Sequence, residues 1–457
     1  MKQDAVSPVM RRLSSYISAA GKRPLPPAVL ERTKHHVLDT IAAMVSGSRL
    51  LPGRKGIAYV STLGGTREAC VIGSRILTNA ANAALANGMC AHADETDDSH
   101  APSVMHPGCG IVPAALAVAE KEGRNGEALL RAVALGYDVA TRLTVSLNAF
   151  KFREDGLSTH SYGPTFGAAA AAGLLVGLNE RQARYLLSYA AQQASGISCW
   201  MRDADHIEKA FDFGGMPARN GVTAATMVAQ GFTGVDDVFA GERNFFVAHG
   251  RPANPEEMVR GLGEDYEILR TNIKRWSVGS PIQAPLDSLS ELIRKNALKA
   301  DQVEKLTIRV AHRDKNTTDE RPMPDINMQH MCAVMLMEGT VTFKSSHDEK
   351  RFRDPKVLEF RKKIDLQGDD ALTRTMPARQ AIVELALRDG RTLRHHTLAV
   401  RGTAENPMSR AEVDAKSYDL IAPIAGKARA RRLCDALWNL ESLKDVRKLR
   451  PLLQEKP

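Results

Sequence analysis

The sequence predicts a mainly α protein made of a large helical domain and a smaller α+β lid domain with an antiparallel sheet. Three observations support this fold class. Apolar residues recur at helical spacing over most of the first 265 positions, period-two alternation begins only beyond them, and helical spacing returns after residue 405. At 457 residues the chain also exceeds the length that one hydrophobic core usually serves. We therefore expect the helical domain over 1–267 and 406–457, and the lid over 268–405.

The helical domain is expected to contain a series of amphipathic helices. Pairs such as Pro52-Gly53 and Asn87-Gly88 are expected to mark breaks between them. Ala and Gly are abundant while aromatic residues are scarce, so we expect the helices to approach one another closely. Apolar periodicity places helices at residues 29–44, 111–120, 129–143, 166–178, 182–195 and 222–229.

The prediction of an α+β lid domain rests on the signals of several strands and one helix. Residues 306–310 alternate apolar and polar side chains, as a half-buried strand does. Residues 381–387 and 393–400 flank Asp389-Gly390, a pair typical of tight hairpin turns. Residues 331–336 look helical, and the tail from 408 to 453 is helical again, so we expect it to pack on the large domain.

Charge and composition narrow the classes of molecule that the protein is expected to bind. The formal net charge of +9 suits nucleic acid, an anionic membrane or a small anion. The basic residues are scattered, and the run at 427–432 lies on an amphipathic pattern typical of a solvated helix face. Basic and aromatic residues are not interleaved as in nucleic-acid grooves, so we predict a small anionic substrate and no nucleic acid.

The expected location is the cytoplasm. The six cysteines form no CxxC pair, which is typical of reduced thiols in a cytosolic protein. The first ten residues lack the apolar core of a signal peptide, and no apolar run reaches the ~18 residues that a membrane span needs. We therefore predict no membrane association.

The densest polar stretch runs from His92 to His100 and continues to His106. It places four carboxylates within five residues, from Asp94 to Asp98, among three histidines. Imidazole and carboxylate together are the equipment of general acid–base catalysis. The alternatives are a solvated acidic loop or a divalent-metal site, including the DExxD pattern of isoprenoid synthases. No second acidic motif or HExxH completes a metal site, so we predict none.

Two further clusters are candidates for the same site. His160 and Tyr162 lie in what looks like a Gly/Pro turn before the Ala-rich helix, whose N-terminus would favour anions. Capping alone is the alternative role for His160. Lys209 and the pair Lys274-Arg275, beside a Trp at the predicted domain junction, are cations suited to carboxylates, or ordinary surface residues.

Cofactor motifs are missing from the sequence. There is no Walker loop, no GxGxxG after a strand and no GxSxG elbow. The predicted chemistry is therefore cofactor-free: histidine and carboxylate transfer protons, while lysine and arginine hold an anionic substrate.

Taken together, the motifs resemble those of the MmgE/PrpD family, which includes 2-methylcitrate dehydratase, cis-aconitate decarboxylase and iminodisuccinate epimerase. The resemblance extends over nearly the whole chain, and the order and spacing of the motifs are specific. The segments that carry it are Leu38-Asp-Thr40, Ala86-Asn87-Gly88, the acidic loop with His106-Pro107, Gly136 to Arg142, His160 to Gly167, Lys209 to Gly221, Lys274 to Gly279, Gly339, and Gly402 to Pro407.

The resemblance implies a helical domain built from both chain ends, an inserted α+β lid, a homodimer and no metal. It places four residues on family active-site positions: His106, His160, Lys209 and Lys274. It also places Glu95, Asp97, Asp98 and Ser99 on the acidic-loop positions, whereas a shift of one residue would give the first two roles to Asp94 and Asp98.

The chain departs from the family pattern at several positions. Thr96 replaces a Phe of the acidic loop, and the loop around Ser99 differs from that of 2-methylcitrate dehydratase. Gly279 stands where decarboxylases carry a second active-site His, which argues against cis-aconitate decarboxylase. Ser161-Tyr162 replaces a Pro-Thr pair, and the tyrosine could serve as an acid, a base or a substrate hydrogen bond.

We therefore predict a cofactor-free, dehydratase-like lyase that abstracts a proton α to a carboxylate of a small di- or tricarboxylate. His106 or His160 removes the proton and Tyr162 is a further candidate acid or base. The cations Lys209, Lys274 and Arg275 bind carboxylates, while Glu95, Asp98 and Ser99 complete the substrate site. The alternatives are an epimerase on the same scaffold, a non-catalytic carboxylate-binding relative, and a divalent-metal hydrolase built on the acidic loop.

Overall fold

A computed structural model describes residues 6–249 and 252–455, so part of the N-terminal stretch used in the signal-peptide prediction lies outside the described residues. The chain divides into two compact units. The first comprises residues 1–93, 97–271 and 420–457, and the second comprises 94–96 and 272–419. The second unit begins four residues after the predicted lid boundary and continues beyond residue 405. The boundary falls inside helix α20 (Arg410–Ala425).

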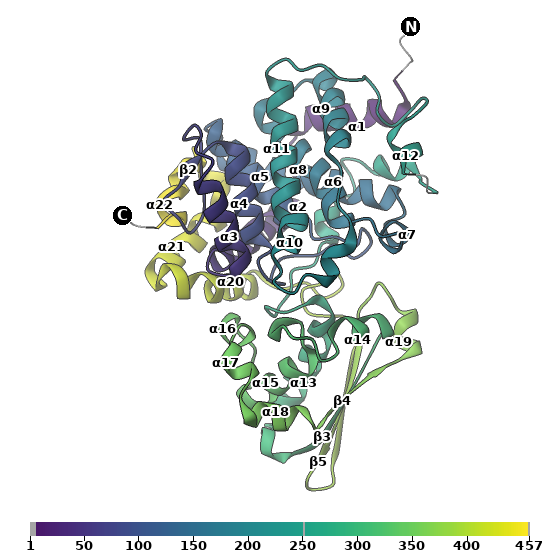
Figure 1. Ribbon diagram of the computed structural model, residues 1–457, viewed down its shortest axis with the longest axis vertical. Coiled ribbons are helices and arrows are strands. Elements are labelled where there is room, and N and C mark those ends of the chain that lie inside the picture. The colour runs from purple at the N-terminus through teal and green to yellow at the C-terminus, as the bar shows by residue number, and fades with distance from the viewer. Residues whose placement is uncertain (1–5, 250–251, 456–457) are drawn as a thin grey trace. The chain divides into compact units, whose positions relative to one another are not determined.

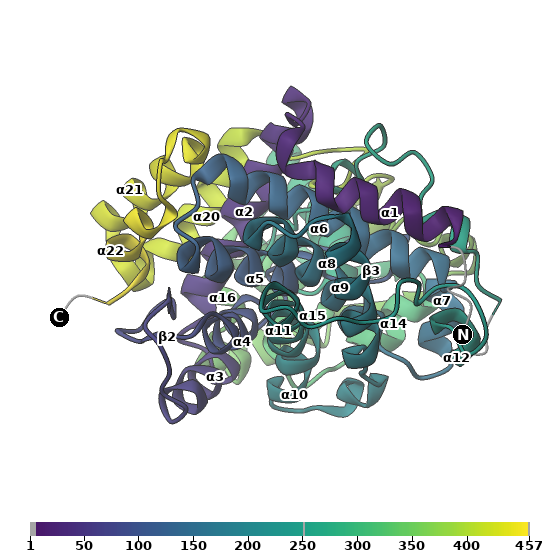
Figure 2. The same ribbon diagram turned by 90° about the horizontal axis from the view of Figure 1, so that it is seen from above.

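Helices make up most of the first unit (Figures 1 and 2). A short antiparallel pair, β1 (Ala69–Cys70) and β2 (Leu77–Thr78), accompanies them. The helices of this unit are α1 (Pro8–Ala19), α2 (Pro27–Gly47), α3 (Leu51–Ser61), α4 (Ala80–Ala91), α5 (Gly108–Lys121), α6 (Gly126–Ser146), α7 (Ala149–Glu154), α8 (Thr159–Val176), α9 (Glu180–Gln193), α10 (Ile207–Ala210), α11 (Met216–Ala229), α12 (Phe245–Ala248), α21 (Lys427–Trp438) and α22 (Arg450–Leu453).

Helix α8 is central to this unit and packs against α5, α6, α9 and α11 (Figure 2). Small residues make the packing close. A Cβ atom added to Gly167 of α8 would lie 2.5 Å from the carbonyl oxygen of Gly136 of α6, so neither position has room for a side chain. The predicted close approach of the helices is confirmed here.

Two predicted breaks are wrong because glycine serves packing rather than a turn. Asn87-Gly88 lies inside α4, where a Cβ on Gly88 would be 2.4 Å from the carbonyl oxygen of Gly214. Helix α8 begins at Thr159 rather than Phe166, so the segment that was expected to form a Gly/Pro turn is instead the N-terminal part of the helix. Gly163 within that segment packs against the backbone of α6, since its Cβ would lie 2.7 Å from the carbonyl oxygen of Ala140.

The second unit contains a four-stranded sheet in the order β4-β3-β5-β6. The predicted hairpin is present as the antiparallel pair β5 and β6, and β3 pairs antiparallel with β5. Strand β4 adds a parallel pair with β3, which the hairpin pattern did not predict. The elements of this unit are α13 (Gln283–Asn296), β3 (Val303–Val310), α14 (His312–Thr318), α15 (Met328–Glu338), α16 (Phe343–Ser346), α17 (Glu349–Phe352), α18 (Pro355–Arg361), β4 (Ile364–Gly368), α19 (Asp370–Arg374), β5 (Ala381–Leu387) and β6 (Thr392–Thr397).

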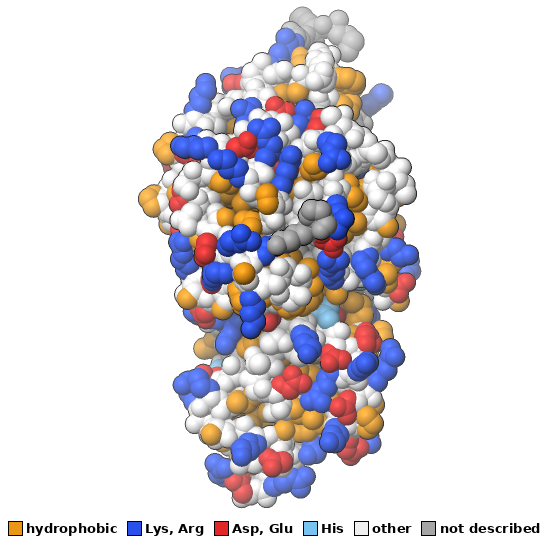
Figure 3. Space-filling model, turned by 90° about the vertical axis from the view of Figure 1, so that its left-hand side faces the viewer, with side chains coloured by type: hydrophobic (Ala, Val, Ile, Leu, Met, Phe, Trp, Pro, Cys, Tyr) orange, Lys and Arg blue, Asp and Glu red, His pale blue; other side chains and the backbone are white. Residues whose placement is uncertain are grey.

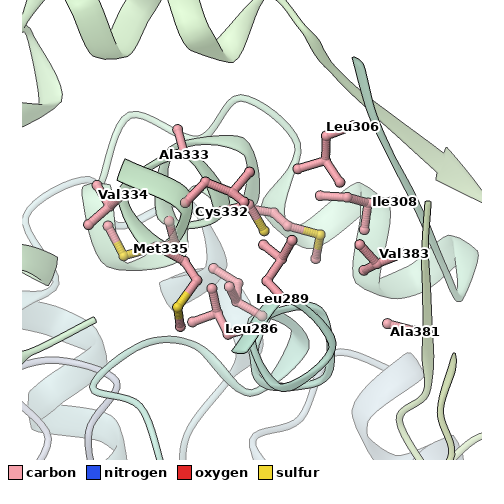
Figure 4. Packing of buried hydrophobic residues seen from close by; sticks show 14 of the residues in the cluster. Leu286, Leu289, Leu306, Ile308, Cys332, Ala333, Val334, Met335, Ala381 and Val383 are labelled. Atoms are coloured by element: carbon pink, nitrogen blue, oxygen red, sulfur yellow. The ribbon is translucent and has the colours of Figure 1, made fainter. Parts of the chain in front are cut away.

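The core of the second unit lies between the sheet and two helices (Figure 4). Leu286 and Leu289 of α13 meet Met335 of α15, and Ile308 of β3 and Val383 of β5 face them. The alternating pattern that predicted the strands therefore puts its apolar side chains into this core. The mainly α fold class with a smaller α+β unit is confirmed.

The structure bears on two expectations from the sequence: scattered basic residues and no membrane-spanning helix. Lys and Arg side chains are spread over the face shown in Figure 3, with Asp and Glu among them. Helix α21 carries the basic run 427–432 and buries one face through Leu433 and Leu437. Within residues 6–249 and 252–455, no helix is both long enough and apolar enough to cross a bilayer.

Candidate active site

The acidic segment that stood out in the sequence is divided between the units. Asp94–Thr96 belong to the second unit, and the chain enters the first unit at Asp97. The side chains from Asp94 to Asp98 are all buried, which excludes a solvated acidic loop. Each half of the segment has its own set of partners.

Asp97 joins two histidines. Its Oδ1 lies 3.0 Å from Nδ1 of His106, and its Oδ2 lies 3.0 Å from Nδ1 of His92. Asp97 and His92 are fully buried, whereas the His106 side chain is 11% exposed. A carboxylate can only accept hydrogen bonds, so both neutral imidazoles carry their hydrogen on Nδ1 and present a basic Nε2.

Phe213 separates two imidazole rings. Its ring centroid is 4.2 Å from that of His92 and 3.7 Å from that of His160, and the rings are tilted by only 19° and 9°. Two rings stacked this closely on one face would overlap, so the histidines occupy opposite faces of Phe213. The His106 ring lies beside this stack, 5.1 Å from His92 and 5.3 Å from His160. Phe213 therefore fixes the spacing of the three histidines.

Each member of the cluster is placed by the end of an element. His92 is the C-cap of α4, His106 comes just before α5, and His160 is the second residue of α8. Phe213 lies in a π-helical turn, Phe211–Gly215, between α10 and α11. Such turns are rare and are frequent at functional sites. The glycine contact between this turn and α4 brings Phe213 against His92.

Lys209 adds a positive charge to the cluster. Its ammonium lies 5.4 Å from the ring centroid of Trp200 and 5.2 Å from that of Phe213. Cation–π contacts of this kind attract an ammonium to the faces of aromatic rings. The predicted residues His106, His160 and Lys209 are thus brought together in the first unit.

Asp212 lies at the N-terminus of α8. The Ser158 hydroxyl donates a hydrogen bond to its carboxyl group, which is buried. Burial raises the pKa of Asp212 to about 7, although hydrogen bonds from Ser158 and Ser161 oppose the increase. The helix end that was expected to favour an anion therefore already has a carboxyl group of the protein beside it.

Both carboxylate oxygens of Asp98 have hydrogen-bond partners within the first unit. Its Oδ1 accepts a hydrogen bond from the backbone N–H of Gly108 at 2.9 Å. Its Oδ2 accepts one from the Tyr137 hydroxyl at 2.5 Å and lies 2.7 Å from Nδ1 of His36. These contacts tie α2, α5 and α6 together, which favours a structural role for Asp98 over the predicted binding of substrate.

Tyr162 lies on a different side of α8 from His160. Residues two apart on a helix point about 200° apart around its axis. The Tyr162 ring contacts Phe152 and His249, at centroid distances of 4.9 and 5.1 Å. The prediction that Tyr162 is an acid or base depended on its standing in a turn beside His160, and the helix removes that reason.

In the second unit, the buried carboxylate of Asp94 forms an ion pair with the half-buried His347. Nε2 of His347 lies 3.1 Å from Oδ2 of Asp94, and its Nδ1 lies 2.8 Å from the carbonyl oxygen of Phe343. Both ring nitrogens thus face acceptors, which suits an imidazolium. Burial would lower the pKa of His347, but Asp94, with the charge of Asp325, raises it to about 9.

Two buried lysines hold the next two residues. Lys274 donates a hydrogen bond to the carbonyl oxygen of Glu95 at 2.5 Å, and its Nζ lies 3.8 Å from the Glu95 carboxylate. Lys416 donates one to the carbonyl oxygen of Thr96 at 3.0 Å. The predicted residues Lys274 and Glu95 are therefore brought together in the second unit.

The remaining predicted residues have less specific surroundings. The Arg275 guanidinium lies 4.4 Å from the Trp276 ring centroid and 3.5 Å from the carboxylate of Asp287, so it already has an acidic partner. Ser99 is half-buried in the first unit. Their predicted roles in binding a substrate stay predictions.

The histidine–carboxylate group also has the residue types of a metal site. Potential ligand atoms of His92, Asp97 and His106 lie within 4.8 Å of one another. The two 3.0 Å separations are hydrogen-bond distances, and a carboxylate that orients two imidazoles accounts for them fully. The absence of a metal from the chemistry stays a prediction.

Several residues of the two clusters were missed from the sequence. His92 lies in the polar stretch that was singled out, but no role was assigned to it. Phe213 lies in the segment from Lys209 to Gly221, where an aromatic side chain gave no signal of its own. His347 is an isolated histidine, and only the fold shows its partner.

Comparison with known proteins covers most of the chain. Residues 11–258 match the model of the MmgE/PrpD N-terminal domain, and residues 276–441 match that of the MmgE/PrpD C-terminal domain.

Curated relatives match over nearly their full length. A cis-aconitate decarboxylase-like protein of Aspergillus oryzae is 23% identical over 97% of this chain and 97% of its own. The cis-aconitate decarboxylase of Aspergillus terreus is 22% identical over 98% and 96%. The human cis-aconitate decarboxylase is 24% identical over 93% and 90%.

Proposed function

This chain belongs to the MmgE/PrpD family, and we propose that it is a cofactor-free lyase that removes a proton next to a carboxylate of a small di- or tricarboxylate. The observation that carries the proposal is the Asp97–His106 pair, with His160 and Lys209 in the same cluster. The names of the relatives support the substrate class, because cis-aconitate is a tricarboxylate.

His106 is the general base in this proposal. Its Nδ1–H is donated to Asp97, which leaves the Nε2 lone pair to take the proton from the substrate carbon. The carboxylate then stabilises the imidazolium that forms, as in other histidine–carboxylate pairs. Asp97 is buried while part of His106 is exposed, so the imidazole is the group that can meet a substrate.

Lys209 and His160 supply the other two functions. The ammonium of Lys209 holds a substrate carboxylate and stabilises the negative charge that develops as the proton leaves. His160 protonates the leaving hydroxyl, so the electrons of the broken C–H bond form a carbon–carbon double bond while water departs. Lys274 and Arg275 stay predicted carboxylate ligands on the basis of the sequence.

Decarboxylation is the second candidate. The names of the relatives favour it, whereas Gly279, in place of the decarboxylase histidine, argues against it. In that reaction a carbon–carbon bond breaks, carbon dioxide leaves, and His106 or His160 protonates the carbon that remains. Epimerisation loses its main support here, because Tyr162 faces away from His160.

Proton exchange in D₂O tests the proposal. The protein is incubated with a panel of di- and tricarboxylates, and proton NMR follows deuterium incorporation and products. We expect an unsaturated product from at least one member, and a rate about 10²–10⁴-fold lower for His106→Gln. His35→Gln is the matched control, since His35 is a buried histidine of α2 that contacts Trp438 instead of the cluster.

The outcomes separate the candidates. Release of carbon dioxide would replace dehydration by decarboxylation, and exchange with inversion but no elimination would indicate an epimerase. Binding without exchange for the whole panel would overturn the proposal and leave a carboxylate-binding protein.

A further inference from the structure

His92 is enclosed within the first unit. The residue is fully buried, and its Nε2 has no hydrogen-bond partner among the described residues. Phe213 covers one face of its ring, and the rings of His106 and His206 are each 5.1 Å away. An imidazole in these surroundings cannot touch a substrate, so any effect on the reaction passes through its neighbours.

The neighbour that connects His92 to the reaction is Asp97. One carboxylate oxygen of Asp97 lies 3.0 Å from Nδ1 of His92, and the other lies 3.0 Å from Nδ1 of His106. A hydrogen bond to one oxygen draws negative charge away from the other. His92 therefore determines how much of the Asp97 charge is available to His106, and it also fixes the carboxylate plane.

We propose that His92 is a positioning residue, which sets through Asp97 both the orientation of His106 and the ease with which it releases a proton. The inference rests on the proposed role of His106 as the base. A base that binds its proton too tightly would not turn over near neutral pH. Within the first unit, the titratable rings next to His92 are those of His106, which precedes α5, and of His206 at the start of α10. His160 of α8 lies beside His106, and the ammonium of Lys209 lies over Phe213.

Two substitutions of His92 separate the hydrogen bond from the ring. His92→Phe keeps a ring against Phe213 but removes the donor to Asp97. His92→Asn keeps an N–H close to the position of Nδ1 but removes the ring. If the donor is what matters, only the phenylalanine variant should change how His106 titrates.

The pH profile of kcat/KM is the first measurement. In His92→Phe the acidic limb should move to higher pH by at least about half a unit, roughly the effect of one hydrogen bond. Turnover should also fall about tenfold as Asp97 loses its second anchor. His92→Asn should restore the position of the limb. His36→Phe is the matched control, because it removes the same donor from the adjacent Asp98 and should leave the limb unchanged.

A titration of His106 by NMR keeps the inference separate from the proposed function. The ring proton resonances of His106 are followed against pH in the wild type and in both His92 variants, with no substrate. The inference requires a titration midpoint at higher pH in His92→Phe and a midpoint near that of the wild type in His92→Asn. Equal midpoints in all three proteins would overturn it, whether or not the chain proves to be a lyase.

Discussion

Asp94 and Asp97 are three positions apart in one acidic segment, yet their carboxylates have different kinds of partner. Asp94 is paired with His347, whose two ring nitrogens both face acceptors. Asp97 receives the Nδ1–H groups of two imidazoles whose Nε2 atoms point elsewhere. The first arrangement neutralises a carboxylate and fixes the chain. The second keeps the carboxylate charge available to a histidine that changes its protonation state.

The comparison shows that the partner, rather than the acid, decides what a buried carboxylate does. Lys274 and Lys416 continue the pattern of the first half by binding the carbonyl oxygens of Glu95 and Thr96. In the second half, Asp98 has a structural role, because it accepts hydrogen bonds from Tyr137 and from the first residue of α5. Only Asp97 orients the proposed base, so mutations across this short segment should have very different effects.

The largest effect is expected at Asp97. Replacing it by Asn removes the charge that stabilises a His106 imidazolium and leaves an amide that can donate, so the wrong tautomer becomes accessible. We expect kcat/KM to fall about 10³–10⁴-fold, as when other histidine–carboxylate pairs lose the charge. The matched change Asp94→Asn should cost less than about tenfold, because Asp94 orients no proposed base. Equal losses would contradict the division of the segment.

Asp98 should act on stability instead. Asp98→Ala leaves the Tyr137 hydroxyl, His36 and the N–H of Gly108 without their acceptor inside the first unit. We expect the free energy of unfolding to drop by about 3–4 kcal/mol in urea titrations. A fully stable variant that fails to bind substrate would instead restore the predicted binding role.

The His347 ion pair predicts how stability depends on pH. The folded-state pKa of His347 is about 9, above the ~6.5 of an unfolded histidine, so its contribution is complete below pH 6.5 and is lost as pH rises to 9. The wild type should lose up to about 3 kcal/mol of unfolding free energy over that range. His347→Gln should show a flatter dependence, and an identical slope in both proteins would rule the pair out as the cause.

The smallest effect is expected at Tyr162. Its ring packs with Phe152 and His249, away from the stack on Phe213. Tyr162→Phe keeps the ring, so it should change kcat/KM by less than about threefold and stability by about 1 kcal/mol or less. A loss of two orders of magnitude in activity would support the predicted role of Tyr162 as an acid or base.

Local patterns in the sequence were enough to predict the fold class. Helical periodicity locates α2, α5, α6, α9 and α11, and the Asp-Gly turn locates the hairpin, because both signals depend on neighbours in the chain. The start of α8 and the course of α4 were not predictable in this way. Gly88 and Gly163 look like breakers, but they are required by backbones that approach from distant segments.

The residues of the candidate site could be singled out from the sequence where one segment carries several reactive side chains. The histidines and acids between His92 and His106 stand out because they are dense in the sequence. Lys209 stands out because it lies in a segment that resembles a family motif. The tasks of the individual acids could not be predicted, because each depends on a partner far along the chain. Asp94 meets His347 and Asp98 meets Tyr137 only after folding.

Nitrogen-15 NMR of the histidine side chains tests the division of the segment most directly. His347 should carry hydrogen on both ring nitrogens until the pH approaches 9. The neutral forms of His92 and His106 should carry theirs on Nδ1, and Asp97→Asn should disturb these two signals while leaving His347 unchanged. A His347 that is neutral at pH 7, or a neutral His106 with its hydrogen on Nε2, would contradict the account.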